Sequence, residues 1–214
     1  MTKYKYSKSS DFYKETKKDF FSKNSKFLKK VESFNEIYSS QPLRTNCKLC
    51  KSKLPKKEDF FSHNIAYKFC QSCSHLNGSF EETEEFVKSL YLSEEAEYSK
   101  NYIDKDFIKR SQDIYMPKVD FLIESINLAN FEVLDVGCGS GYFVYSCILK
   151  KIKAKGIDVN KDMVDFGNKQ ILHQIKCEPL SYVDEKTFYD SICNTKAQVI
   201  TAIGVIEHLR DLDL

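Results

Sequence analysis

Residues Val133–Phe143, VLDVGCGSGYF, carry the strongest structural signal in the chain. The apolar beginning predicts a buried strand, and Gly137, Gly139 and Gly141 predict a tight turn that leads into a helix. Such a turn allows backbone to approach a ligand closely, and the next helix offers the unpaired N–H groups of its first turn. The stretch therefore predicts a site for a nucleotide-like ligand at the carboxyl end of a strand.

Strands and helices alternate from this stretch to the end of the chain. Alternation at these lengths is typical of a parallel sheet with crossover helices. We therefore predict an α/β fold, a Rossmann-like parallel sheet of about four strands, over residues 118–214. Strands are expected at residues 131–137, 153–159, 175–183 and 197–204, and helices at residues 140–151, at residues 160–174 and from residue 205 onward.

Three segments precede this domain. Residues 1–43 are rich in lysine, and apolar residues at helical spacing (Phe20, Phe27, Val31, Phe34 and Tyr38) predict an amphipathic helix there. The lysine face is either solvated or a patch for a polyanion. Residues 44–80 hold two cysteine pairs and form the expected metal module. Residues 81–117 are expected to be a helical linker or lid, with a helix that starts at Pro117.

Two acidic residues accompany the glycine turn. Asp135 lies two residues before Gly137, and Asp158 ends the second predicted strand. A carboxylate at that tip, about 20 residues beyond the turn, can accept hydrogen bonds from both hydroxyls of a ribose. The alternative role for Asp158 is to cap the next helix, for which Asn160 and Asp162 are also placed.

The pattern D-x-G-x-G-x-G resembles motif I of the class I S-adenosylmethionine-dependent methyltransferases, and VIEHL at residues 205–209 resembles the segment after their fourth strand. The resemblance implies that S-adenosyl-L-methionine is the cofactor and that the glycines, Asp135 and Asp158 bind it. It also implies that Val159 and Met163 flank the adenine and that Ala202 and Ile203 lie beside the methionine part. Core packing is the alternative for Met163.

The resemblance also bears on catalysis. Glu207 and His208 are candidates for a general base, and the alternative is that they cap and pack their helix. Tyr98 and Tyr102 are candidates for a lid. Members of the family have seven strands and this chain reaches four, so we expect a C-terminally truncated fragment with weak or absent catalysis.

The sequences CKLC and CQSC place Cys47, Cys50, Cys70 and Cys73 in two C-x-x-C pairs. Four thiolates from two such turns can close a tetrahedral Zn²⁺ shell, and a closed shell is structural and not catalytic. A redox dithiol is the alternative. His75 follows the second pair, but four sulfurs already complete the shell.

Composition narrows the class of partner. The formal net charge is only +2, and the chain has neither a leader-like apolar region nor a membrane-length apolar run, so we expect a cytoplasmic protein without a membrane partner. Base-modifying enzymes carry an Asn/Asp-Pro-Pro-aromatic motif where this chain reads AIGV (residues 202–205), so a nucleic-acid acceptor is not expected.

The segment around the second cysteine pair resembles the lead-in of methyltransferases for sugars and other small metabolites, with Ser74 in place of a usual glycine. We therefore expect a small-molecule acceptor. The alternatives are a non-catalytic zinc-containing binding or scaffold protein and a fragment of an RNA methyltransferase.

Overall fold

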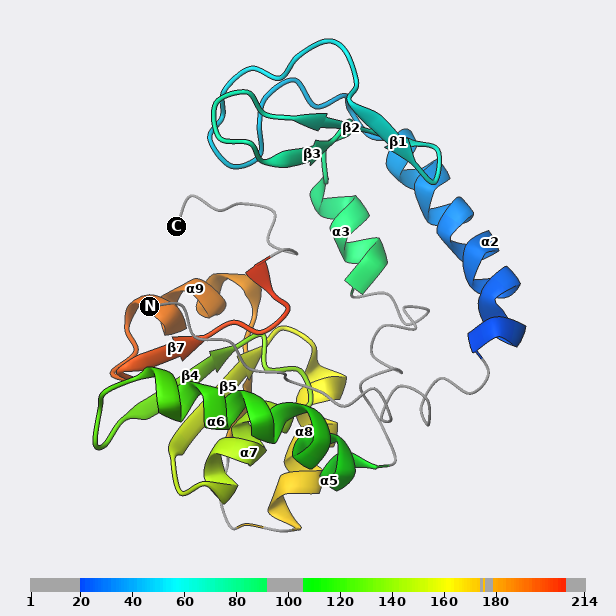
Figure 1. Ribbon diagram of the computed structural model, residues 1–214. Coiled ribbons are helices and arrows are strands. Elements are labelled where there is room, and N and C mark those ends of the chain that lie inside the picture. The colour runs from blue at the N-terminus through cyan, green and yellow to red at the C-terminus, as the bar shows by residue number, and fades with distance from the viewer. Residues whose placement is uncertain (1–19, 92–105, 174, 176–178, 207–214) are drawn as a thin grey trace. The chain divides into compact units, whose positions relative to one another are not determined.

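The computed structural model describes residues 20–91, 106–173, 175 and 179–206 (Figure 1). These residues fall into two compact units, residues 20–91 and residues 106–206, which are described separately below. In the described part of the chain, no helix is both long enough and apolar enough to cross a membrane.

The second unit is built on a sheet of four parallel strands, which confirms the predicted α/β fold. The strands are β4 (Glu132–Val136), β5 (Lys153–Asp158), β6 (Leu180–Tyr182) and β7 (Val199–Thr201). They lie in the order β6-β5-β4-β7, so the order reverses between β4 and β7. In open α/β sheets, ligands bind outside the carboxyl ends of the strands at such a reversal. The third and fourth strands are shorter than the sequence predicts.

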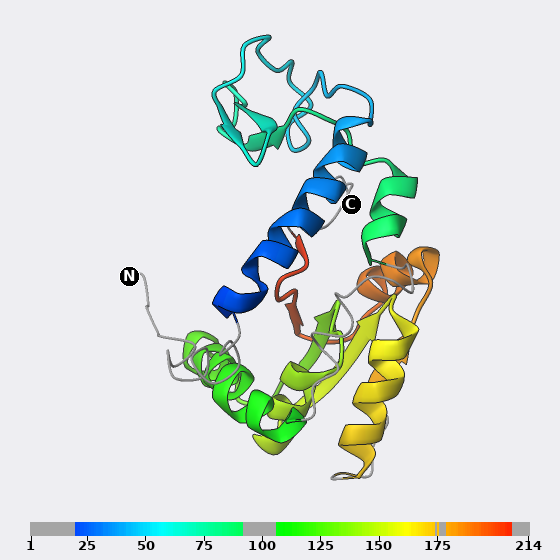
Figure 2. The ribbon, with the colours of Figure 1, turned by 90° about the vertical axis from the view of Figure 1, so that its right-hand side faces the viewer.

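Helices cover both faces of this sheet, as parallel strands require. Alternate residues of β4 enter different clusters: Val133 packs with Val119, Phe143 and Cys147 of α6 (Met116–Ser125) and α7 (Tyr142–Leu149). On the other face, Leu134 and Val136 pack with Phe188 of α9 (Glu185–Cys193). Figures 1 and 2 show the helices around the strands. The third cluster joins α7 to α8 (Lys161–Leu172) and β6.

The helix that precedes the sheet begins earlier than predicted. Pro117 lies in the first turn of α6, as predicted, but helical backbone already starts at α5 (Phe107–Arg110) and continues through a π-helical turn (Ser111–Tyr115) into α6. The π-helix is rare and occurs mostly as single turns inside α-helices, and here the turn ends two residues before Pro117, which lacks an N–H group. Phe107 from this early segment stacks on Tyr142 of α7, at 4.7 Å between ring centroids.

The first unit contains the predicted amphipathic helix, α2 (Phe20–Ser39), a small antiparallel sheet and α3 (Glu84–Tyr91). The sheet consists of β1 (Phe60–Ser62), β2 (Ile65–Phe69) and β3 (Leu76–Gly78), with β2 in the centre. Tyr38 ties α2 to this sheet, because its hydroxyl donates a 2.8 Å hydrogen bond to the carbonyl of Phe80. The buried cluster around the cysteines consists of only Cys47, Leu54 and Cys70.

Candidate functional site

The glycine turn is held against the end of β5 by backbone hydrogen bonds. The N–H groups of Gly137 and Cys138 both donate to the carbonyl of Ile157, at 2.9 and 3.0 Å. Gly137 and Gly139 have φ of 66° and 55°, a left-handed conformation that favours glycine. The turn is thus a fixed feature of the carboxyl edge of the sheet.

The carboxylate of Asp158 also binds this turn. Oδ2 accepts a 2.7 Å hydrogen bond from the N–H of Gly139, and Oδ1 accepts one of 2.8 Å from the N–H of Asn160. Burial raises the pKa of Asp158, and the backbone donors oppose that rise. Since each carboxylate oxygen has a second acceptor position, a diol could still donate to both. Asn160, and not Asp158, caps α8, because its side chain accepts from the N–H of Met163.

Asp135 lies beneath the turn and is linked to β7. Its Oδ1 accepts a 2.6 Å hydrogen bond from the hydroxyl of Thr201. The side chain is buried, which raises its pKa to about 7; the Thr201 hydrogen bond opposes the rise, and the charge of Asp158 adds to it. The turn therefore lies between two acidic groups whose proton occupancy depends on their surroundings.

Three side chains lie close to the glycines of the turn. A Cβ on Gly137 would lie 2.5 Å from Cγ2 of Val205, which follows β7, and one on Gly139 would lie 2.7 Å from Cε of Met163. Met163 is buried in the first turn of α8. The structure thus brings Asp158, Met163 and Val205 together around the turn, and glycine is needed at both positions.

Three other predicted cofactor residues are partly buried and follow the strands β5 and β7. Val159 packs against the cluster of Leu134 and Ile157, and Ile203 packs against the cluster of Val133. Ala202 is partly buried just after β7. The predicted base candidates Glu207 and His208, and the predicted lid residues Tyr98 and Tyr102, lie outside the described residues.

The sequence analysis did not predict two residues of the site, Thr201 and Gly167. Thr201 gave no signal beyond its place in a predicted strand. Gly167 lies in the middle of α8, and a Cβ there would collide with the backbone oxygen of Ser140 in the glycine turn. A glycine inside a helical pattern often has such a packing reason, so Gly167 was open to prediction.

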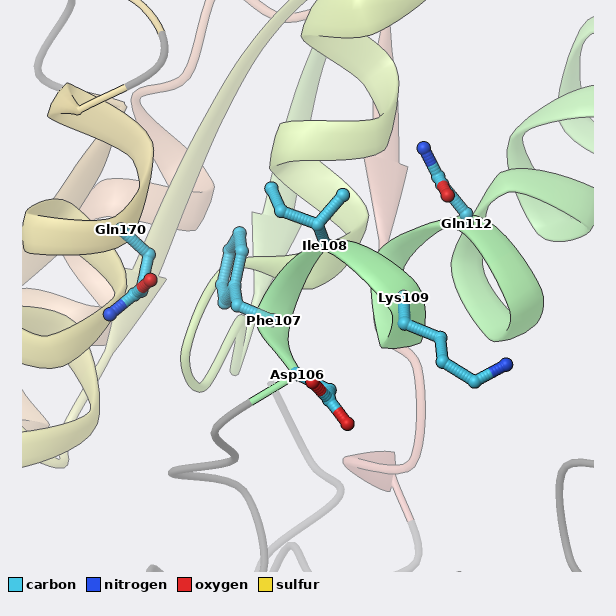
Figure 3. A pocket seen from close by; sticks show the side chains of 6 residues that line it. All are labelled: Asp106, Phe107, Ile108, Lys109, Gln112 and Gln170. Atoms are coloured by element: carbon cyan, nitrogen blue, oxygen red, sulfur yellow. The ribbon is translucent and has the colours of Figure 1, made fainter. Parts of the chain in front are cut away.

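A shallow pocket lies elsewhere on this unit, between the segment that begins α5 and the second half of α8 (Figure 3). None of the predicted site residues lines it. Its walls are Asp106, Phe107, Ile108, Lys109, Gln112 and Gln170.

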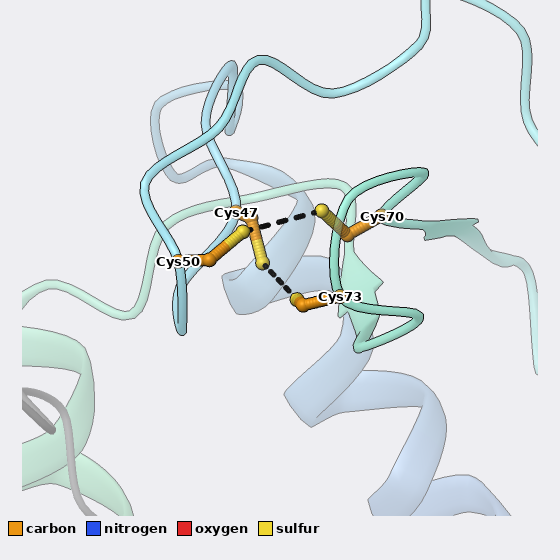
Figure 4. A group of neighbouring side chains, drawn as sticks. All are labelled: Cys47, Cys50, Cys70 and Cys73. Carbon is orange, nitrogen blue, oxygen red and sulfur yellow. Dashed lines mark hydrogen bonds between the residues drawn. The ribbon is translucent and has the colours of Figure 1, made fainter.

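The four predicted metal-binding cysteines converge in the first unit (Figure 4). Their sulfur atoms all lie within 4.8 Å of one another. The Sγ atoms of Cys47 and Cys73 are 3.7 Å apart, and those of Cys50 and Cys70 are 3.4 Å apart. A tetrahedron of Zn–S bonds has S···S edges of about 3.8 Å. All four are free thiols, so the arrangement fits a Cys₄ metal shell.

The two cysteine turns have the same backbone geometry. In each, the N–H of the first cysteine donates to the carbonyl five residues later, and its own carbonyl accepts from the residue after the second cysteine. The residue after the second cysteine, Lys51 in one turn and Ser74 in the other, has positive φ in both. The matching bonds are Cys47–Ser52 (2.8 Å) and Lys51–Cys47 (3.0 Å) in one turn, and Cys70–His75 (2.9 Å) and Ser74–Cys70 (2.8 Å) in the other.

Hydrogen bonds within the cluster shift the pKa values of its thiols in opposite directions. Hydrogen bonds from the side chain and backbone of Ser52, followed by those of Cys73 and Cys70, lower the pKa of Cys50 to about 6. The pKa of Cys73 rises to about 12: the backbone of His75 lowers it, but burial and the three other cysteines outweigh that effect. The pKa of Cys47 is also lowered: burial raises it, but hydrogen bonds from the backbone of Cys50 and Leu49 and from the side chains of Asn77 and Cys73 outweigh that effect. Two sulfurs of the set are thus disposed to be thiolates, the form that binds metal.

No family model matches the sequence, and no curated protein matches it. Among solved structures, the plantazolicin methyltransferase BpumL in complex with SAH is similar at 18% identity and a TM-score of 0.39, over 54% of this chain and 44% of that chain. BpumL with a pentazolic desmethylPZN analog and SAH is similar at 17% identity and a TM-score of 0.33, over 47% of this chain and 38% of that one. The chain spans less than half the length of these structures, and likenesses at this level carry no argument about function.

Proposed function

We propose that residues 106–206 form the cofactor-binding part of an S-adenosylmethionine-dependent methyltransferase that acts on a small molecule. The observation that carries this proposal is the position of Asp158. Its carboxylate lies at the tip of β5 against the N–H of Gly139, beside the point where the strand order reverses. A glycine turn that faces a strand-tip carboxylate at this point of an α/β sheet is suited to a ligand with a ribose diol.

The other residues take their roles from this anchor. Asp158 accepts the ribose hydroxyls, and the backbone at Gly137, Gly139 and Gly141 makes room for the rest of the ligand. Met163, which already contacts the turn from α8, and Val159 flank the adenine. Ala202 and Ile203, which follow β7, lie beside the methionine part, and Asp135 contributes to the site from β4, two residues before Gly137.

S-adenosylmethionine supplies an already activated methyl group, so the protein needs mainly to orient the acceptor and to remove its proton. Glu207 and His208 directly follow the described end of this unit, and we propose them as the proton-accepting groups. The acceptor that we propose is a sugar or a related small metabolite.

We also propose that Cys47, Cys50, Cys70 and Cys73 hold a structural Zn²⁺ ion. Three observations support it: four converging sulfurs, two turns of matching geometry and a buried cluster of only three residues. Such a cluster is too small to fold the segment, and metal binding supplies that free energy in modules of this kind. Four protein ligands leave no open coordination position, so the ion's role is structural.

Isothermal titration calorimetry with S-adenosylmethionine tests the cofactor proposal. The wild type is expected to bind, and Asp158→Ala to bind at least about tenfold more weakly, because two hydrogen bonds to a charged group are lost. Asp190→Ala, an exposed change on α9, is the matched control and keeps wild-type affinity. A wild type that shows native circular dichroism and no binding would refute the proposal.

The zinc proposal needs a separate measurement. Protein prepared without added metal is expected to contain about one Zn²⁺ per chain. Removal by a chelator should abolish the hydrogen-exchange protection of β1, β2 and β3 and leave the amides of β4 and β5 protected. Retained protection of β1–β3 in metal-free protein contradicts a structural role for the ion.

A further inference from the structure

We propose that Asn77 is a positioning residue of the Cys₄ site: its side-chain amide donates a hydrogen bond to the sulfur of Cys47 and holds the two cysteine turns in register for the metal. This inference rests on the zinc site proposed above. Asn77 is not one of the ligands, and it lies in β3, outside both C-x-x-C pairs.

The evidence is a set of three contacts made by one buried amide. Asn77 is 2% exposed. Its Nδ2 lies 3.6 Å from Sγ of Cys47 and donates a 2.9 Å hydrogen bond to the carbonyl of His75, while its Oδ1 accepts a 2.9 Å bond from the N–H of Lys48. Lys48 lies within the first cysteine turn and His75 closes the second, so a single side chain bridges both.

Each contact has a distinct consequence. The bonds to Lys48 and His75 fix the spacing of the two turns, and with it the spacing of the sulfurs they carry. The bond to Cys47 places an N–H donor against a proposed ligand atom and so helps to orient that sulfur. Metal sites commonly depend on such outer donors, and their removal costs about 10- to 100-fold in metal affinity.

The amide is also difficult to replace. Aspartate has the same shape and can accept from Lys48, but it can donate neither to the sulfur of Cys47 nor to the carbonyl of His75, and it adds a negative charge beside the sulfurs. Leucine removes every bond and leaves the buried N–H of Lys48 without this acceptor. Comparison of the two variants shows what the bond from Lys48 contributes once both side-chain donations are lost.

The experiment titrates the full chain with Co²⁺ and then displaces the cobalt with Zn²⁺. The wild type is expected to show the d–d bands of a tetrahedral cobalt thiolate site. We expect Asn77→Asp to bind zinc about 10- to 100-fold more weakly, with shifted sulfur-to-cobalt charge-transfer bands, and Asn77→Leu to lose at least as much. Gln71→Leu, an exposed amide between Cys70 and Cys73, is the matched control and retains wild-type values.

Asn77→Ser serves as a second variant in case Asn77→Asp does not fold, because the smaller side chain leaves space for water to replace the bridging bonds. We expect Asn77→Ser to transfer its zinc to a chromogenic chelator faster than the wild type does. Wild-type affinity and spectrum in Asn77→Asp, or a wild-type transfer rate in Asn77→Ser, overturns the role of Asn77. A wild-type chain without a tetrahedral cobalt spectrum instead refutes the zinc site itself, so the two failures are distinguishable.

Discussion

The hydroxyl of Thr201 donates a 2.6 Å hydrogen bond to Oδ1 of Asp135 and so joins the side chains of β7 and β4. The two residues are direct partners in the sheet. Their bond lies where the strand order reverses, directly below the glycine turn. A carboxyl group thus lies buried at the proposed cofactor site with one hydroxyl donor, and its charge state affects both stability and binding.

Asp135→Asn is expected to make the stability of the α/β unit less dependent on pH. The pKa of Asp135 is raised from 3.8 to about 7 by burial, so folding favours the protonated carboxyl. The stability from this proton is complete below pH 4 and is lost as pH rises through 7. Asparagine carries no such proton, so the variant should be more stable than the wild type at pH 8, by up to a few kcal/mol.

Urea denaturation from pH 4 to pH 8 measures this effect. Asp158 contributes a slope of the same sign, since its pKa is also raised, so the variant's profile becomes flatter without becoming level. Asp190→Asn changes an exposed carboxyl and keeps the wild-type profile. Parallel profiles for wild type and Asp135→Asn would contradict a raised pKa at Asp135.

Thr201→Val should destabilise the unit more at pH 8 than at pH 5. A hydrogen bond to an ionised group contributes about 1.5–3 kcal/mol, against about 1 kcal/mol for a neutral one. Thr201→Ser retains the hydroxyl and is expected to retain most of the stability. The measurement is the free energy of unfolding at both pH values, and an equal loss for Thr201→Val at the two would show that the hydrogen bond does not depend on the charge of Asp135.

Gly167→Ala is expected to lower both stability and cofactor affinity. Alanine normally stabilises a helix by about 1 kcal/mol relative to glycine. Here its Cβ would collide with the backbone oxygen of Ser140, and overpacking of this kind costs about 1–3 kcal/mol. Thermal denaturation gives the sign of the change. Lys169→Ala, an exposed change in the same helix, should stay close to wild type, and a more stable Gly167→Ala would show that α8 can move away from the turn.

Ser74→Gly should stabilise the cysteine module. Ser74 has φ of 60°, and a side chain in this conformation costs about 1–2 kcal/mol, partly offset by the entropy that glycine loses on folding. The expected net gain is about 0.5–1 kcal/mol. Ser72→Gly, in the same turn but without a positive φ, should instead destabilise. Denaturant titrations with zinc present measure the change in the free energy of unfolding for each variant. A change of the same sign in both variants would argue against relief of strain at Ser74.

Much of the α/β unit could be predicted because its signals are local. The alternation of apolar strands and helices identified β4, α7, β5 and α8, and the sequence offered Asn160 and Asp162 as caps of α8, of which the structure shows Asn160. The helix α9 was missed, although Asp184 caps it by accepting from the N–H of Thr187. It is short, with nine residues, and Phe188 provides its buried contact.

The division into four segments, the roles of the cofactor residues and the roles of Glu207 and His208 stay predictions. The convergence of the four cysteines was predictable, because each C-x-x-C turn directs two sulfurs to one point. The role of Asn77 was not, because it depends on how β3 pairs with β2 and thereby brings the amide between the two turns.

Local patterns in the chain were sufficient for the kind of fold, the glycine turn and each of the two C-x-x-C turns, because each depends on residues close together in the sequence. The partners of those residues came from contacts across the fold. Thr201 lies 66 residues from Asp135, and Asp158 lies 19 residues from Gly139. Hydrogen bonds over such separations depend on which strands become neighbours, and strand order is determined by the burial of both faces of the sheet rather than by any single segment.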